Sequence, residues 1–148
     1  MERGNRRNAL RVSCMIILDT SFVVSYKMGN DTNHQKAMEL MKEIAGGKYG
    51  EVAISDYIFD EVVTVILVRS RSLSLATEAG NELIKYTNID RIGDEIFDSA
   101  WKVFSYQKDT KFSFTDCVTL SLMERKKIAH IATFDAKFRK IKDVAVVS

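Results

Sequence analysis

The sequence predicts an α/β protein: a three-layer α/β/α fold with a central parallel sheet of about five strands. Short aliphatic runs alternate with longer helical segments, and each run has the length of a strand buried on both faces. Such alternation favours parallel strands joined by helical crossovers. The chain has 148 residues and no proline, so it fits one domain without an internal linker.

The expected elements run through the whole chain. Strands are expected at 15–18, 52–54, 87–92, 130–133 and 144–147. Helices are expected directly after residue 19 and at 33–45, 56–71, 74–85, 94–107 and 113–127. Ser55 is the expected cap of the third helix. Trp101 and Phe104 are expected to pack against the sheet.

Positive charge is concentrated at two places. Residues 1–14 hold four arginines against one glutamate, and we expect a disordered basic extension there, followed by one domain at 15–148. Residues 125–142 hold seven lysines and arginines with Asp135 as their only acid, a pattern that can attract phosphate. The alternative is that three of these cations simply end a helix and complement its dipole.

Several classes of protein are disfavoured. The longest apolar run, "VVTVILV" at 62–68, is far shorter than the roughly 20 residues that span a membrane. The N-terminus does not resemble a signal peptide, so a cytoplasmic protein is expected. Cys14 and Cys117 form neither a disulfide framework nor a four-ligand zinc site.

Four acids are predicted to meet at one edge of the sheet. Asp19 directly follows the first aliphatic run, and Asp135 lies two residues past the fourth. Asp116 begins the helix before that fourth strand, and Glu61 lies in the second turn of the helix that follows the second strand. In open α/β sheets, ligands bind beyond the carboxyl ends of the strands. These acids are therefore candidates for one site.

Three of the acids also have a structural interpretation. Asp19 can cap the helix that follows it, because Asp is a favoured N-cap residue. Asp116 fits a capping box that begins at Ser113. Asp135 can cap a short helical turn. The sequence alone leaves these alternatives open.

Glu61 is harder to explain structurally. It shares a stripe of its expected helix with Ile58, Val65 and Val68, and an acid inside an apolar stripe must find a partner. Four clustered acids would repel one another unless a cation were present. An all-oxygen site suits Mg²⁺ or Mn²⁺, and such ions support hydrolysis of phosphodiester bonds.

These motifs together resemble the PIN-domain ribonucleases, in particular the VapC-type toxins. The matching stretches are "ILDTSFVV", "DEVV", "SFTDC" and "TFDAKF", with their acids separated by 42, 55 and 19 residues. The resemblance covers nearly all of residues 15–148. It implies that Asp19, Glu61, Asp116 and Asp135 are catalytic metal-site carboxylates. Thr20 or Thr115 would assist through a water held by the metal.

The resemblance also implies an activity and partners. The expected activity is Mg²⁺- or Mn²⁺-dependent endonucleolytic cleavage of single-stranded or structured RNA, in a homodimer held inactive by a small antitoxin. Its candidate phosphate contacts are basic residues that flank two of the acids: Lys111, Lys137, Arg139 and Lys140. The alternative is a PIN-fold module that holds RNA or a partner protein without cleaving it. Weak metal affinity and an absence of cleavage would favour that alternative.

Overall fold

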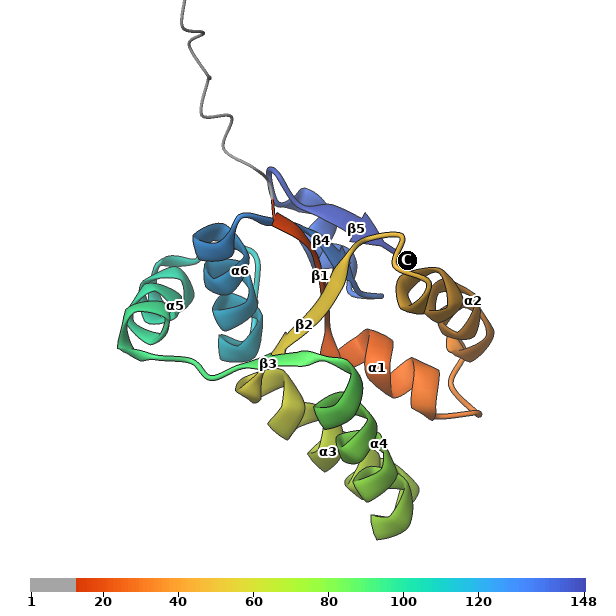
Figure 1. Cartoon of the computed structure of the whole chain (residues 1–148). Helices are drawn as coiled ribbons and strands as arrows, with labels where there is room; N and C mark the ends of the chain where they lie inside the picture. Colours follow the sequence, from red (N-terminus) through yellow and green to blue (C-terminus); the bar gives the residue numbers. More distant parts are fainter. Residues whose placement is uncertain (1–12) are drawn as a thin grey trace, which may run out of the picture.

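The computed structural model describes residues 13–148, which form an all-parallel five-stranded sheet in the order β3-β2-β1-β4-β5 (Figure 1). The strands are β1 (Ser13–Leu18), β2 (Glu51–Ser55), β3 (Asn88–Asp90), β4 (Ile128–Ala132) and β5 (Ala145–Val147). The predicted parallel sheet is confirmed. Strand β1 lies at its centre, which explains why the first aliphatic run is apolar on both faces.

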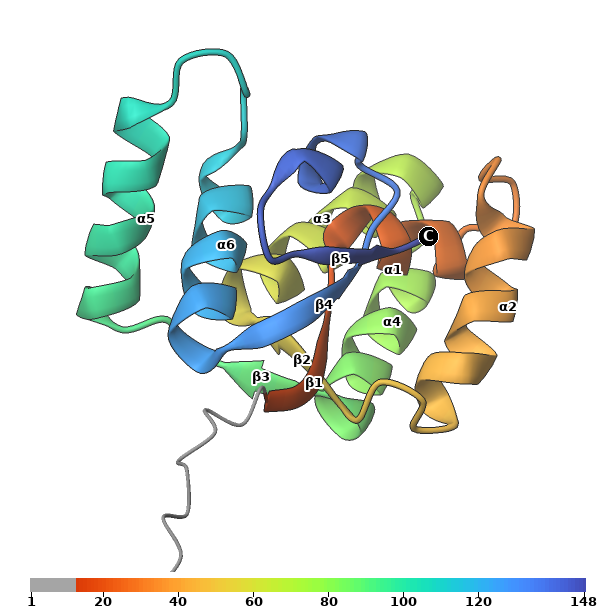
Figure 2. The same ribbon diagram turned by 90° about the horizontal axis from the view of Figure 1, so that it is seen from above.

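Helices connect each strand to the next. They are α1 (Thr20–Lys27), α2 (His34–Ala45), α3 (Asp56–Ser70), α4 (Leu73–Tyr86), α5 (Asp94–Tyr106), α6 (Phe114–Lys126) and the short 3₁₀ helix η1 (Ala136–Lys140). Figure 1 shows α5 and α6 on one side of the sheet and α1 and α2 on the other, and Figure 2 shows the same arrangement from above. This is the three-layer arrangement expected from the alternation of strands and helices.

The expected elements all occur, with boundaries that differ by a few residues. The largest differences are at β3, which is shorter than the expected 87–92, and at β4, which begins at Ile128 rather than at residue 130. Strand β1 begins at Ser13, two residues before the expected start of the domain. Most of the predicted basic extension at 1–14 lies outside the described residues.

The strand register sets two chain segments side by side at the carboxyl edge of the sheet. Leu18 pairs with Ala132, so the next residue along each chain, Asp19 and Thr133, leaves its strand at the same level. The backbone N–H of Asp19 donates to the carbonyl of Ala132 at 2.9 Å, which continues the ladder by one step. Residues that follow β1 and β4 are therefore neighbours, although more than 110 positions separate them in sequence.

Two side-chain predictions are wrong. Trp101 is 55% exposed, because its helix α5 packs on α6 and not on the sheet. The Trp101 ring stacks on the ring of Phe104 and lies beside that of Phe114. The buried face of α3 carries Ile58, Val62 and Ile66, so the predicted stripe shares only Ile58 with it, and Glu61 lies beside it. Within residues 13–148, no helix is both long enough and apolar enough to cross a membrane.

Candidate active site

Asp19 lies buried between β1 and α1, with only 5% of its surface exposed. It occupies the N-cap position of α1, yet its side chain makes no capping hydrogen bond. Its Oδ2 instead accepts hydrogen bonds from the Thr133 hydroxyl at 2.7 Å and from the Ser21 hydroxyl at 3.0 Å. The capping interpretation of Asp19 is therefore wrong, and this carboxylate is held in place from the neighbouring strand.

The same two hydroxyls fix the loop that carries Asp135. The backbone N–H of Phe134 donates to Ser21 Oγ at 3.1 Å, and that of Asp135 donates to Thr133 Oγ1 at 3.0 Å. Each hydroxyl thus donates to Asp19 while accepting from the chain that follows β4. The result is a fixed spatial relation between Asp19 and Asp135.

Asp116 reaches the site from the first turn of α6. The predicted capping box is confirmed: Ser113 Oγ accepts from the N–H of Asp116 at 3.0 Å, and Asp116 Oδ2 accepts from the N–H of Ser113 at 2.9 Å. The box does not exclude a second role, because a carboxylate has about four acceptor positions. Asp116 is half-buried and lies within electrostatic range of both Asp19 and Asp135.

Asp135 caps η1, as the structural interpretation predicts, and it also forms an ion pair with the side chain of Lys137. Its Oδ1 accepts from the N–H of Lys137 at 3.0 Å, and its Oδ2 lies 2.8 Å from Lys137 Nζ. The hydrogen bond and charge of Asp135 raise the pKa of Lys137, and the charges of Asp116 and Asp19 act in the same direction. Lys137 is therefore a fixed positive charge beside the acids.

The environment disfavours negative charge on two of the acids. Burial raises the pKa of Asp19 to about 6, the hydroxyl of Thr133 opposes this shift, and the charge of Asp116 adds to it. Burial also raises the pKa of Asp116, against the hydrogen bonds from Ser113, and the charge of Asp135 raises it further. A cation at this position would relieve both causes, because it would offset the repulsion and replace the lost hydration.

Glu61 is placed differently from the other three acids. It is half-buried on α3, beside the buried face rather than on it. Helix α3 does contact both α1 and α6, the two helices whose first turns hold Asp19 and Asp116. No contact places its carboxylate against another acid in the part of the chain that the structure describes. Its role in a metal site remains a prediction from the resemblance.

The supporting residues predicted from the sequence have mixed placements. Thr20 is buried, and among residues 13–148 its hydroxyl finds no hydrogen-bond partner, whereas Thr115 is half-buried and its carbonyl accepts from Thr119. Lys111 is exposed, in a left-handed backbone conformation with φ of 54°. Two further predicted cations, Arg139 and Lys140, are exposed on η1, and Arg139 donates to the hydroxyl of Ser148.

Sequence reasoning missed Thr133 and treated Ser21 only as part of a motif. Thr133 is fully buried and supplies the shortest hydrogen bond to Asp19. A signal was present in the sequence, because Thr133 directly follows an aliphatic strand just as Asp19 does. The register that makes the two residues neighbours is a tertiary feature, and one sequence does not reveal it.

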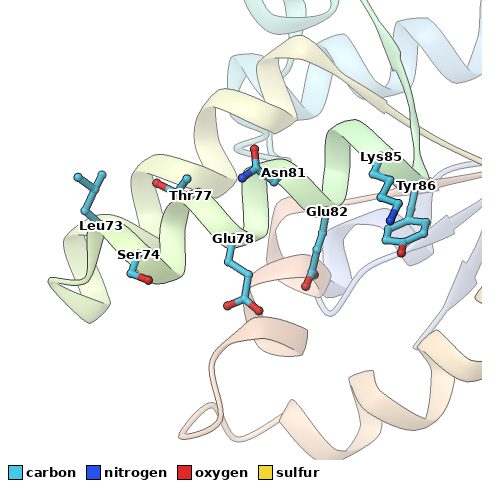
Figure 3. Close-up of a pocket in the computed structure, with 8 residues that line it drawn as sticks. All are labelled: Leu73, Ser74, Thr77, Glu78, Asn81, Glu82, Lys85 and Tyr86. Carbon is cyan, nitrogen blue, oxygen red and sulfur yellow. The ribbon is translucent and has the colours of Figure 1, made fainter.

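One surface hollow lies away from these acids. It runs along α4, and Figure 3 shows the eight side chains that line it, among them Glu78, Glu82 and Lys85. None of the four candidate acids takes part in it. It is open and shallow, so we do not assign the chemistry to it.

The donor set fits a hard divalent cation. Asp19, Asp116 and Asp135 offer oxygen ligands only, which Mg²⁺ and Mn²⁺ prefer. Burial, and to a lesser extent the charge of a neighbouring acid, raises the pKa of Asp19 and of Asp116, and such an ion would offset both causes. In residues 13–148, no three acid, histidine or cysteine side chains already lie at ligand spacing.

The family follows from the extent of the sequence match. A family model described as the PIN domain matches residues 16–144, which include all four candidate acids. The chain belongs to the PIN-domain family. The resemblance to this family, which four short sequence motifs indicated, is confirmed over most of the chain.

Relatives and solved structures agree with this assignment. The chain is 26% identical over 129 residues to a VapC ribonuclease from Archaeoglobus fulgidus, which covers 82% of this chain and 78% of that protein. Its fold is similar to that of Mycobacterium tuberculosis VapC20, described as a toxin that cleaves the sarcin-ricin loop, with a TM-score of 0.74, 22% identity, and coverage of 82% and 90% of the two chains. It is also similar to a chain of Rickettsia felis VapBC2 bound to a promoter DNA fragment, with a TM-score of 0.65, 12% identity, and coverage of 90% and 97%.

Proposed function

We propose that this protein is a metal-dependent endoribonuclease and the toxin of a toxin-antitoxin pair, with residues 15–148 as its nuclease domain. One observation carries the proposal: a buried Asp19 at the end of the central strand lies within electrostatic range of Asp116, in a chain of the PIN-domain family. The VapC ribonuclease relative supports RNA as the substrate. The toxin description of VapC20 and the VapBC2 complex support the biological role.

The proposed cofactor is Mg²⁺ or Mn²⁺, held by Asp19, Asp116 and Asp135, with Glu61 as a further ligand. Such an ion lowers the pKa of a nearby water and offsets charge on the phosphate. Ser21 and Thr133 act as positioning residues, because their hydroxyls fix the orientation of the Asp19 carboxylate. Good catalysis depends on such fixed ligand orientation.

The proposed RNA contacts come from the basic side chains near the acids. Lys137 is the nearest of them, and the exposed Lys111, Arg139 and Lys140 would hold phosphates further along the strand. These contacts carry no sequence information by themselves, so they would position RNA without selecting its sequence.

We also propose a small antitoxin partner and a homodimer. The second half of α3 supports an interface, since Leu67 and Val68 are exposed, Val68 by 69%. Adjacent apolar side chains that stay exposed are typical of surfaces that bind another protein. Sedimentation of the full chain at micromolar concentration would show a dimer, and a monomer at that concentration would contradict this assignment.

Cleavage of RNA by the full chain tests the main proposal. A mixed-sequence single-stranded RNA and a structured RNA are incubated with the protein in Mn²⁺, in Mg²⁺ or in EDTA. The protein should cut in the presence of metal and fail in EDTA. Asp116→Asn should abolish cutting, because it removes a metal-site charge, while its amide oxygen can still accept the capping hydrogen bond from Ser113.

Asp98→Asn is the matched control, because Asp98 is exposed on α5 and carries no predicted role. It should cut as the wild type does. Cutting by Asp116→Asn at the wild-type rate would contradict the assignment of the site. Failure of the wild type to cut either RNA, together with failure to bind Mn²⁺ in calorimetry, would instead favour a module that holds RNA or a partner protein.

A further inference from the structure

The ammonium group of Lys137 is built into the acid cluster rather than being a free surface charge. Asp135 binds both ends of the residue, the backbone N–H at 3.0 Å and Nζ at 2.8 Å. The next residue, Phe138, is fully buried and packs against Phe112 with ring centroids 5.3 Å apart. This packing anchors η1, so the lysine projects from a fixed backbone and its charge reaches Asp116 and Asp19 as well.

The charges around Lys137 limit what else can bind. The three aspartates whose charges act on Lys137, together with its one ammonium group, leave two negative charges, which one divalent cation neutralises. If Glu61 is added, three negative charges remain, whereas two divalent cations need four. The acids alone would match two ions, so Lys137 changes the balance.

We propose that Lys137 is a built-in counter-ion that takes the place of a second divalent cation, so that the site binds a single metal ion. This inference rests on the proposed metal-dependent nuclease function. In two-metal nucleases, both ions clamp the reacting phosphate and its oxygens. With a single ion bound, the ammonium group of Lys137 would supply part of the positive charge that a bound phosphate needs.

Calorimetric titration of the full chain with Mn²⁺, without RNA, tests the inference. The wild type should bind one ion. Lys137→Met should bind the first ion on the order of tenfold more tightly, because a like charge near the ion is removed, and should take up a second ion at higher concentration. Lys137→Arg should bind one ion as the wild type does, because the positive charge is kept.

Lys142→Met is the matched control, since Lys142 lies two residues past the same short helix, is exposed, and forms no ion pair among the described residues. It should leave both the number of ions and the affinity unchanged. Circular dichroism would verify that each variant is folded, as expected for a change at a partly exposed side chain.

The outcomes separate this inference from the proposed function. Two ions bound to the wild type, or a Lys137→Met variant identical to it in affinity and number of ions, would overturn the counter-ion role and leave the nuclease intact. A wild type that binds no Mn²⁺ would overturn the metal site itself and the inference with it. One ion on the wild type and two on Lys137→Met would establish the role.

Discussion

The charged clusters at the two ends of α1 differ in kind: one brings mainly like charges together, and the other pairs opposite charges. At its start, the acid Asp19 is buried, and the charges that act on it are those of the acid Asp116 and, more weakly, of Lys137 at the edge of the cluster. At its end, the cation is only partly exposed: the side chain of Lys27 is 12% exposed and lies 3.1 Å from Glu82, on the helix that Figure 3 shows.

The difference separates a cluster that stabilises the fold from one that does not. Lys27 faces two carboxylates that remain well solvated, with Glu78 60% exposed and Glu82 40% exposed, so every charge there has a partner or water. At Asp19 the folded chain brings like charges together and removes water from them, which costs free energy. A protein retains such an arrangement at sites where function requires it.

The largest expected effect comes from Asp19→Asn, which should change activity and stability in opposite directions. RNA cleavage should fall about a thousandfold, the equivalent of roughly 4 kcal/mol at the transition state, because a metal ligand is lost. Without metal, the free energy of unfolding should rise at neutral pH by up to the order of 3 kcal/mol, since the pKa of Asp19 is raised from 3.8 to about 6. Urea unfolding in EDTA measures this difference.

The pH dependence gives the sign of that effect. A carboxyl group whose pKa is raised in the folded state favours folding while it is protonated. The stability of the wild type is therefore highest, on this account, below about pH 4, falls as the pH rises to about 6, and stays low above it. Asp19→Asn should lack this loss, while Asp98→Asn should keep it. An Asp19→Asn protein that is less stable at pH 7 than the wild type would show a structural carboxylate instead.

The sequence was sufficient to place Asp19 and Asp116, because each lies in a local sequence pattern that identifies its position. Asp19 directly follows an aliphatic run that only a buried strand explains, and Ser113 with Asp116 spells a capping box that the structure contains. Chain order and strand pattern therefore placed these two acids. The hydroxyl of Thr133 was missed because its contact with Asp19 depends on the register between β1 and β4.

Two failures of prediction concern the faces of helices. Helix α3 is apolar around most of its circumference, so the stripe through Glu61 and the stripe through Val62 read equally well. The structure buries the second stripe, which weakens the argument that Glu61 must be paired. Trp101 was misplaced for a different reason: α5 packs on α6 rather than on the sheet, and this packing leaves the Trp101 side chain exposed.

Glu61→Gln sharpens the comparison, because Glu61 belongs to neither of the charged clusters at the ends of α1. Its carboxylate is half-buried and has no contact with another acid in the residues described, so we expect a moderate effect. Cleavage should fall about tenfold, the equivalent of about 1.4 kcal/mol, with little change in the free energy of unfolding. Rates in saturating and limiting Mn²⁺ would distinguish weaker metal binding from slower chemistry.

The adjacent and exposed Asp60 offers the control, since Asp60→Asn should leave the cleavage rate unchanged. If Glu61→Gln were as inactive as Asp116→Asn, the glutamate would have to move to the metal on binding. If it cut like the wild type, the ligand set would consist of the three aspartates alone.

The smallest expected effect is at the other end of α1. Lys27→Met should lower the free energy of unfolding by no more than about 1 kcal/mol, because the partners Glu78 and Glu82 are solvated and the ion pairs are screened. Cleavage of RNA should be unchanged, and the loss of stability should shrink in high salt. Lys36→Met, at an exposed position of α2, provides the baseline in the same urea titrations. A Lys27→Met protein that loses cleavage while its stability holds would mean that α1 couples its two ends, and the charged clusters could then no longer be treated as independent.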